Sequence, residues 1–333
     1  MLSAPFYFLP RKVDMKLKDI QNLFVQEGKK TDPRGESVVE LDLLRRKEEY
    51  DILPVNKKET FDVESLTNPY YDSRVLYGNE NLEIKTIMVG IDIETQELLL
   101  AKNLINSGVK IDLVIAHHPE GYAYSTFSSV IGMQTDILNK QGIPVNITEK
   151  IVSERIKEVH RSVSPQNNER VYDAAKLLNI PFMTAHSVAD NHVASFLKDK
   201  IDNLRPLYLK EIIKMLESLP EYQHAIKIGH APFILSGDNY SRCGKVFVDM
   251  TGGTEGPIES FEKLAIAGVG TIVAMHVSPK GVKEAEKHHL NIVLAGHISS
   301  DNLGLNLLFD KLEKKFDQKL EFVECSGFRR FRR

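Results

Sequence analysis

The sequence predicts an α/β protein made of two related lobes that follow a helical and irregular N-terminal extension. From residue 84 onward, short apolar and β-branched runs alternate regularly with helical segments, which is the pattern of a sheet covered by helices. The runs are apolar at nearly every position, and this is typical of strands buried on both faces. We place the extension at 1–82, the first lobe at 83–205 and the second lobe at 206–333.

The composition is that of a globular protein rather than a disordered or fibrous one. The 333 residues are 42% hydrophobic and 27% charged, and a net charge of -3 gives no bulk reason to expect a polyanionic partner. No apolar stretch approaches the roughly 20 residues of a membrane helix. The two cysteines form no CxxC pair or disulfide framework, and residues 1–9 lack the basic start of a signal peptide. We therefore expect a cytoplasmic protein that does not bind a membrane.

The extension is predicted to contain two helices followed by an irregular arm. Apolar residues recur at helical spacing in 15–28, and a more highly charged helix is predicted at about 38–51. Residues 54–80 contain Pro, Asn and Gly with little periodicity, so we interpret them as irregular. Because Met15 would serve equally well as a translation start, we expect residues 1–14 to lie outside the fold.

The first lobe is predicted to alternate strands and helices around one buried sheet. The run IKTIMVGIDI is followed by a helix with a leucine face and then by the fully apolar run IDLVIA. In chain order we predict a strand at 84–93, a helix at 94–107, a strand at 111–116, a helix near 128–141, a short strand near 144–147, a long helical region at about 149–178, a strand at 181–185 and two helices within 192–219.

The second lobe repeats this scheme. We predict strands at 244–250, 271–277, 291–295 and 320–325, and helices at 257–267, 280–289 and 302–316. Within the chain, IDLVIAHH at 111–118 can be laid on LNIVLAGH at 290–297 without a gap, and VGID upstream then falls on VAMH. A duplicated βαβ unit and a chance likeness of short apolar strands both explain this match.

Three predicted strand ends carry histidine, and two of them also carry aspartate. The groups are His117 and His118 in AHHP, His186 and Asp190 in AHSVAD, and His297 and Asp301 in GHISSD. In open α/β sheets, ligands bind beyond the carboxyl ends of the strands. Imidazole and carboxylate together suit Zn, Fe, Mn or Co. The sequence therefore predicts a metal site at the edge of the sheet.

Each group by itself has a simpler explanation. An isolated pair of adjacent histidines is most often part of a surface loop, and in an extended segment the two side chains point to opposite sides. Asp190 and Asp301 could serve only as a helix cap or an N-terminal helix charge. The coincidence of all three groups favours metal binding over three unrelated features.

The three motifs together resemble a family of dinuclear-metal proteins, the Nif-three-like family named after the yeast NGG-one-interacting factor three. Some of its members are described as GTP cyclohydrolase I type 2. The resemblance covers roughly residues 84–328 and implies two divalent metal ions, with His186 lining their site. The metal ligands that it implies are His117, His118, Asp190, His297 and Asp301. It also implies a ring-like homohexamer whose sites face an internal cavity.

Asp301 is a departure from the family pattern, which usually has Glu at this position. A carboxylate that is one methylene shorter can still bridge two ions, with a changed intermetal distance or metal preference.

A dinuclear site predicts hydrolytic chemistry. Two cations a few ångströms apart can activate a bridging hydroxide and stabilise the charge that develops on a phosphoryl or carbonyl oxygen. His186 is the candidate catalytic residue, either as a general acid or base or as a group that orients Asp190. We expect a small phosphorylated or nucleotide-like substrate, with GTP cyclohydrolase-type chemistry as one form. The alternative function is a non-catalytic metal-binding regulatory or scaffold protein.

Several other features have weaker functional interpretations. The glycine loop 252–256 could hold a phosphate, but it lacks the P-loop lysine and Glu255 would repel an anion, which favours a structural turn. His276 could contact a metal ligand without binding the metal itself. Cys325 is expected to be a packed thiol. The tail arginines could contact nucleic acid or a neighbouring subunit, although a frayed solvated end is simpler. These arginines are Arg329, Arg330, Arg332 and Arg333.

Overall fold

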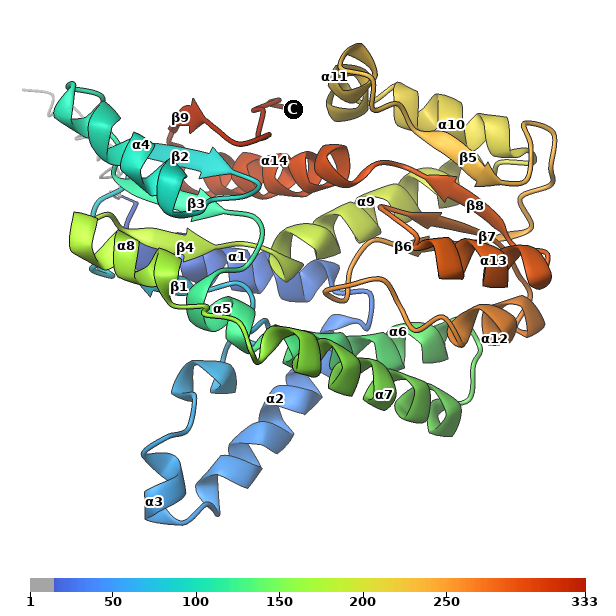
Figure 1. The fold of residues 1–333 in the computed structure, drawn as a ribbon, viewed down its shortest axis with the longest axis horizontal. Coiled ribbons are helices and arrows are strands. Elements are labelled where there is room, and N and C mark those ends of the chain that lie inside the picture. The colour runs from blue at the N-terminus through green and yellow to red at the C-terminus, as the bar shows by residue number, and fades with distance from the viewer. Residues whose placement is uncertain (1–14) are drawn as a thin grey trace, which may run out of the picture.

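The computed structural model describes residues 15–333, so the expectation for residues 1–14 lies outside the described residues. The described chain forms two mixed sheets with helices around and between them, as Figure 1 shows. The first sheet has the strand order β1-β4-β3-β2-β9 and the second has the order β5-β8-β7-β6. This arrangement confirms the predicted α/β fold with two lobes.

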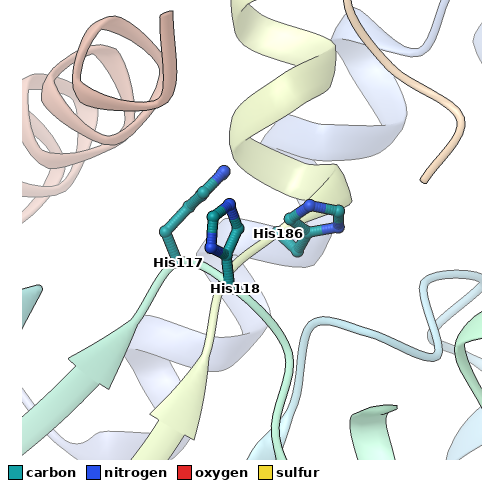
Figure 2. Close-up of side chains that lie close together, drawn as sticks. All are labelled: His117, His118 and His186. Carbon is teal, nitrogen blue, oxygen red and sulfur yellow. The ribbon is translucent and has the colours of Figure 1, made fainter. Parts of the chain in front are cut away.

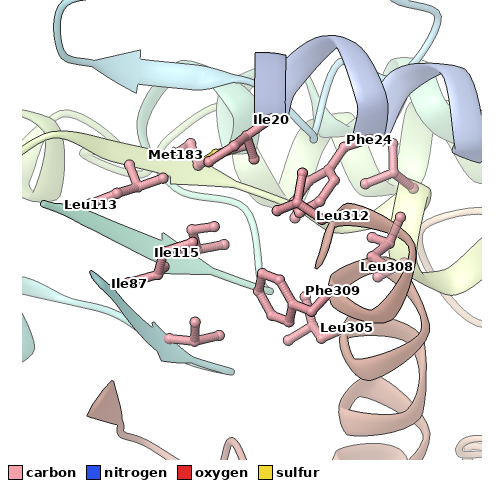
Figure 3. Packing of buried hydrophobic residues seen from close by; sticks show 14 of the residues in the cluster. Ile20, Phe24, Ile87, Leu113, Ile115, Met183, Leu305, Leu308, Phe309 and Leu312 are labelled. Carbon is pink, nitrogen blue, oxygen red and sulfur yellow. The ribbon is translucent and has the colours of Figure 1, made fainter. Parts of the chain in front are cut away.

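The extension contributes to the first sheet and its core. Its elements are α1 (Leu17–Thr31), α2 (Glu36–Asp51), α3 (Val55–Lys58), the 3-10 helix η1 (Val63–Leu66) and β1 (Val75–Tyr77). The arm is more ordered than predicted, because β1 pairs antiparallel with β4 at the sheet edge. Ile20 and Phe24 of α1 pack against strand residues such as Ile115 and against Phe309, as Figure 3 shows. The first α-helix is therefore part of the central core.

The first sheet is built mainly from predicted strands. The next elements along the chain are β2 (Thr86–Gly90), α4 (Thr95–Asn106), β3 (Leu113–Ala116), α5 (Gly121–Ser125), the 3-10 helix η2 (Phe127–Met133), α6 (Gln134–Lys140), α7 (Val145–Val163), α8 (Arg170–Leu178), β4 (Phe182–Thr184) and α9 (Ser187–Leu204). The strand predicted near 144–147 is wrong, because these residues begin α7 directly after Pro144. A three-residue apolar run does not separate a strand from a first helical turn.

The second sheet contains one strand that the sequence pattern did not reveal. Its region comprises α10 (Leu209–Glu217), α11 (Pro220–Lys227), β5 (Phe233–Ser236), β6 (Lys245–Asp249), α12 (Ser260–Ile266), β7 (Val269–Ala274), α13 (Pro279–Lys287), β8 (Asn291–Leu294), α14 (His297–Phe316) and β9 (Glu321–Glu324). β5 is a half-exposed edge strand that pairs antiparallel with β8. β9 returns to the first sheet and pairs parallel with β2. The domain boundary predicted after residue 205 stays a prediction.

The two sheets share one topology. In each, an antiparallel edge strand is followed by three parallel strands in reverse chain order, so β4 corresponds to β8, β3 to β7 and β2 to β6. The proposed match of 111–118 with 290–297 is therefore wrong, because it pairs β3 with β8. The matching strand ends are AHSVAD after β4 and GHISSD after β8, which both place His and Asp four residues apart.

The helices α9 and α14 pack against each other between the two sheets (Figure 1). Their contact is close at Gly304, where an added Cβ would lie 2.5 Å from the carbonyl oxygen of Ala189. Glycine is thus required by the approach of the two helices rather than by a turn. Because these helices follow β4 and β8, their crossing brings the N-terminal ends of both together. None of the described helices is long and apolar enough to cross a membrane.

Candidate metal centre

The structure brings together all six histidines and aspartates of the three strand ends. His117 and His118 follow β3, and Figure 2 shows them beside His186 at the end of the neighbouring strand β4. His297 and Asp301 lie at the start of α14, which follows β8. The rule that ligands gather at the carboxyl ends of strands correctly predicted this convergence.

Both helices that carry an aspartate begin earlier than predicted. α9 begins at Ser187 rather than near residue 192, and α14 begins at His297 rather than at residue 302. His297 and Asp301 are therefore one turn apart on a single helix, which places both side chains on the same face. Gly296 makes this early start feasible, since its φ of 108° is unfavourable for any residue with a side chain.

His117 lies at the centre of the cluster and is completely buried. Its Nδ1 is 3.0 Å from the carbonyl oxygen of Ala185, so Nδ1 carries the proton and donates it to that oxygen. The Nε2 atom then faces the two aspartates. Asp190 Oδ1 and Asp301 Oδ1 each lie 3.4 Å from His117 Nε2.

His118 and His186 are held in the same way, each by a carboxylate at Nδ1. His118 Nδ1 lies 2.6 Å from Asp92 Oδ1, and His186 Nδ1 lies 2.8 Å from Asp72 Oδ2. Their Nε2 atoms face the cluster, at 3.6 Å from an oxygen of Asp301 and of Asp190, respectively. Anchoring Nδ1 fixes the ring and leaves Nε2 as the inward atom, which is the usual arrangement behind metal-binding histidines.

Asp72 belongs to the candidate site and was missed by the sequence analysis, because it lies in the arm predicted to be irregular. It is fully buried and also accepts hydrogen bonds from the hydroxyl groups of Ser73 and Ser187. Burial by itself would raise the pKa of Asp72, but the hydrogen bond and charge of His186 and the two hydroxyl groups lower it. The extension thus holds one imidazole of the cluster in place.

Asp301 occupies the middle of the cluster despite being shorter than the glutamate of the family pattern. Its Oδ1 faces His117, while its Oδ2 lies 3.6 Å from Nε2 of both His118 and His297. Burial raises its pKa, but the charges of the surrounding imidazoles, that of His117 first, outweigh burial and lower the pKa to about 2. The carboxylate therefore stays ionised in a fully buried position.

The net pKa shifts of His117 and His297 have opposite directions. Burial alone would lower the pKa of His117, yet Asp301 and Asp190 hold it well above the ordinary value. Burial lowers the pKa of His297, and the attraction of Asp301 does not fully offset it. His276 lies beside His297, with ring centroids 5.0 Å apart. It follows β7 and so occupies the place that His118 has after β3.

Several buried atoms of the cluster have no hydrogen-bond partner among the described residues. They are His117 Nε2, Asp190 Oδ1, Asp301 Oδ1 and Asp301 Oδ2. Ligand atoms within 4.8 Å of one another form three groups, namely His117 with His118 and His186, His118 with His297 and Asp301, and His117 with Asp190 and Asp301. Unpartnered buried lone pairs gathered in one place are what a bound cation would satisfy. The cluster can therefore hold metal ions.

A pocket of about 450 Å³ opens from the cluster and lies between the two lobes. Besides cluster residues, it is lined by Tyr124, Phe127 and Arg170 of the first lobe and by Asp249 and part of the glycine loop of the second lobe. Burial and the neighbouring Glu255 raise the pKa of Asp249 to about 7. A polar, concave site of this kind beside a metal cluster can admit a small molecule.

The remaining sequence candidates are not part of the histidine and aspartate cluster. The helix predicted at 257–267 begins only at Ser260, so the glycine loop does not end in a helix N-terminus. Cys325 is half-buried, and burial raises its pKa, which is consistent with a packed thiol. The arginine tail is not frayed. Arg330 pairs with Asp310 and Glu313, Arg332 pairs with Glu313, and Arg333 pairs with Glu221.

The fold is similar to that of solved structures. A NIF3 superfamily protein from Sphaerobacter thermophilus matches with a TM-score of 0.67 and 26% identity, over 78% of this chain and 92% of that protein. The chain is a NIF3-like protein. More distant matches are reduced HcgD from Methanocaldococcus jannaschii (TM-score 0.47, 16% identity, 81% and 95% covered) and TTHA1606 from Thermus thermophilus (TM-score 0.45, 14% identity, 78% and 91% covered). No protein-family model and no curated protein matches the sequence.

The assignment confirms the family resemblance that the three histidine motifs indicated. In this NIF3-like chain the motifs occupy the ends of β3, β4 and β8, and they face one pocket. The individual roles of the six residues as metal ligands or acid–base groups stay predictions, and the next section develops them.

Proposed function

We propose that this NIF3-like chain is a hydrolase that binds two divalent transition-metal ions and acts on a small phosphorylated or nucleotide-like molecule. The observation that carries the proposal is the set of unpartnered buried atoms on His117, Asp190 and Asp301. Leaving one such polar atom buried and unsatisfied costs about 1–3 kcal/mol, so a cluster of them is costly unless a ligand binds there.

The division of the cluster into overlapping groups supports two ions rather than one. One group contains His117 and Asp190, another contains His118 and His297, and Asp301 belongs to both. The two oxygens of Asp301 face different groups, as a bridging carboxylate requires. Imidazole and carboxylate ligands without cysteine suit Zn, Fe, Mn or Co.

The chain's own residues supply positioning and proton transfer. Bound divalent ions would supply Lewis acidity and lower the pKa of a water molecule. His186 lines the pocket beside Asp190, and we assign it the transfer of a proton through Nε2. Asp72 keeps the Nδ1 proton on the opposite side of that ring, which fixes the ring orientation.

The open side of the cluster favours catalysis over a purely structural metal site. Structural sites are closed by protein ligands, whereas catalytic sites keep a position open for water or substrate. Here the side chain of His297 is 41% exposed, and four of the candidate ligands line the pocket. The non-catalytic scaffold stays the alternative, and it predicts that metal removal lowers stability while there is no turnover to lose.

Three finer expectations belong to this proposal. GTP cyclohydrolase-type ring opening would use the same activated water, and a homohexamer is proposed from the family resemblance. A cytoplasmic location is expected as well. Nucleic-acid binding by the tail is not favoured, because all four of its arginines already form ion pairs within the chain.

The test is metal content measured by elemental mass spectrometry, together with turnover of phosphoesters and GTP. We expect about two equivalents per chain in the wild type and a loss of metal and turnover in His118→Ala. His160→Ala is the matched control, because this histidine is exposed on α7 and far from the cluster in the sequence. Wild-type turnover in His118→Ala, or in protein stripped of metal, would refute the proposal. Metal binding without any turnover would support the scaffold alternative.

A further inference from the structure

The pocket has a strongly acidic character beyond the metal cluster. Glu94, Glu120, Asp249 and Glu255 line it, and Arg170 is the one lysine or arginine among its described lining residues. The same pocket contains the buried, unpartnered oxygens of Asp190 and Asp301, so a small molecule that enters it reaches the proposed metal ions. An anion in the pocket would be attracted to the proposed metal ions, but the carboxylates that line most of the rest of the pocket would repel it.

Asp249 and Glu255 form the part of this wall that belongs to the second lobe. Asp249 is the last residue of β6, and its carboxylate makes no hydrogen bond or ion pair with the residues that the structure describes. Glu255 is fixed in place, because its Oε1 accepts a hydrogen bond of 2.9 Å from the backbone N–H of Ser278. No hydrogen-bond donor among the described residues contacts the carboxylate of Asp249. Its oxygens can therefore accept a hydrogen bond from a ligand.

Two aromatic residues of the first lobe also line the pocket. The rings of Tyr124 and Phe127 stack with centroids 6.2 Å apart, and the ring of Phe127 lies 5.6 Å from that of His186. A flat apolar group can lie on these rings, with one end near the cluster and the other near the acidic pair.

We infer that Asp249 and Glu255 receive a nitrogen-bearing hydrogen-bond donor, such as a cationic amine or the amino edge of a base, on the organic part of the substrate. This inference rests on the proposed function, which places the phosphoryl group at the metal cluster. A substrate with a second anionic group at its far end is disfavoured. The glycine loop does not change this, since it carries Glu255 and does not lead directly into a helix.

The test compares two phosphonates that cannot be hydrolysed, para-aminomethyl benzylphosphonate and para-carboxy benzylphosphonate. Both present one phosphonate and one ring, and they differ in the charge at the far end. Binding to the metal-loaded protein is measured by calorimetry at about pH 8, where Asp249 is ionised. We expect the amine to bind at least about tenfold more tightly, since it gains charge-assisted hydrogen bonds.

Two double variants test whether Asp249 and Glu255 cause the preference for the amine. Asp249→Asn with Glu255→Gln should bring the ratio of the two affinities close to one, while the glutamine still accepts the Ser278 N–H. The matched control removes two exposed carboxylates away from the pocket, Glu217→Gln with Glu259→Gln, and should keep the wild-type ratio.

The outcomes separate this inference from the proposed function. Equal or tighter binding of the carboxylate, no binding of either phosphonate, or a preference that survives in the Asp249 and Glu255 variant would overturn the inference, even if phosphoesters are hydrolysed. A preference for the amine that depends on these two residues would support it, even if no turnover is found, because calorimetry does not require turnover.

Discussion

The substitution Gly304→Ala tests whether the crossing of α9 and α14 sets the geometry of the metal cluster. Gly304 lies three residues after Asp301 on α14, at the contact with α9. An added Cβ would lie 2.5 Å from the carbonyl oxygen of Ala189, 2.8 Å from its carbonyl carbon and 2.9 Å from a methyl group of Val193. Two of these atoms belong to the backbone of α9 and cannot rotate away.

The distances set the expected size of the effect. Close contacts between carbon and oxygen lie near 3.3 Å, so the two helices must separate by roughly 0.8 Å. Such overpacking destabilises a protein by about 1–3 kcal/mol, and the higher helix propensity of alanine compared with glycine offsets about 1 kcal/mol of this. We therefore expect a net loss of up to about 2 kcal/mol in the free energy of unfolding. Metal–ligand distances tolerate only about 0.2 Å, so metal affinity should fall at least about tenfold.

The assay combines thermal unfolding of the metal-free protein with metal titration. Gly132→Ala is the matched control, because an added Cβ there meets no atom within 4 Å. The control should keep wild-type metal affinity. If Gly304→Ala had wild-type stability and bound metal as the wild type does, the close helix contact would not control the cluster, and the reasoning would be refuted.

Three further predictions concern the groups around the cluster. Asp72→Asn should lower kcat by about tenfold or more with metal content retained, because the ring of His186 loses its carboxylate anchor; steady-state kinetics with metal analysis would show this. Arg330→Ala should lower the free energy of unfolding by about 3 kcal/mol in chemical denaturation, because the Arg330 side chain is only 3% exposed. The side chain of Arg332 is 42% exposed, so Arg332→Ala should lower the free energy of unfolding by less than about 1 kcal/mol. In metal-free protein, the raised pKa of His117 stabilises the folded state fully below about pH 6.5, and this stabilisation is lost as the pH rises through the raised pKa. The melting temperature of the metal-free protein should therefore fall with rising pH. The melting temperature of the metal-loaded protein should not fall in this way, because the ligands must be deprotonated to bind metal.

The site could be predicted in part because its signals are local. Each candidate histidine follows an apolar strand within three residues, each aspartate comes four residues after a histidine, and the ends of parallel strands meet at one edge of a sheet. The HxxxD spacing was visible without a structure, but the helix starts were misplaced by about a turn at His297. Sequence pattern locates helix ends poorly, since caps depend on single residues such as Gly296.

The partners of the histidines could not be predicted, because their contacts join distant parts of the chain. Asp72 and His186 are 114 positions apart, and Asp92 and His118 are 26 apart. Asp72 lies in a segment without periodicity, so no local signal marked it. The arginine tail shows the same limit, since Arg330 is explained by acidic residues on α14 and not by its own neighbours in the sequence.

The sequence by itself determined the α/β class, most strands, and the six histidines and aspartates, because apolar periodicity and strand-end position are properties of short segments. Only the tertiary structure decided the pairing of β9 with β2, the correspondence of β4 with β8, and the placement of Asp72 behind His186. These features depend on the relative position of distant segments. That position is set by the packing of α1, α9 and α14 in the shared core, and it leaves no periodic signal in the chain.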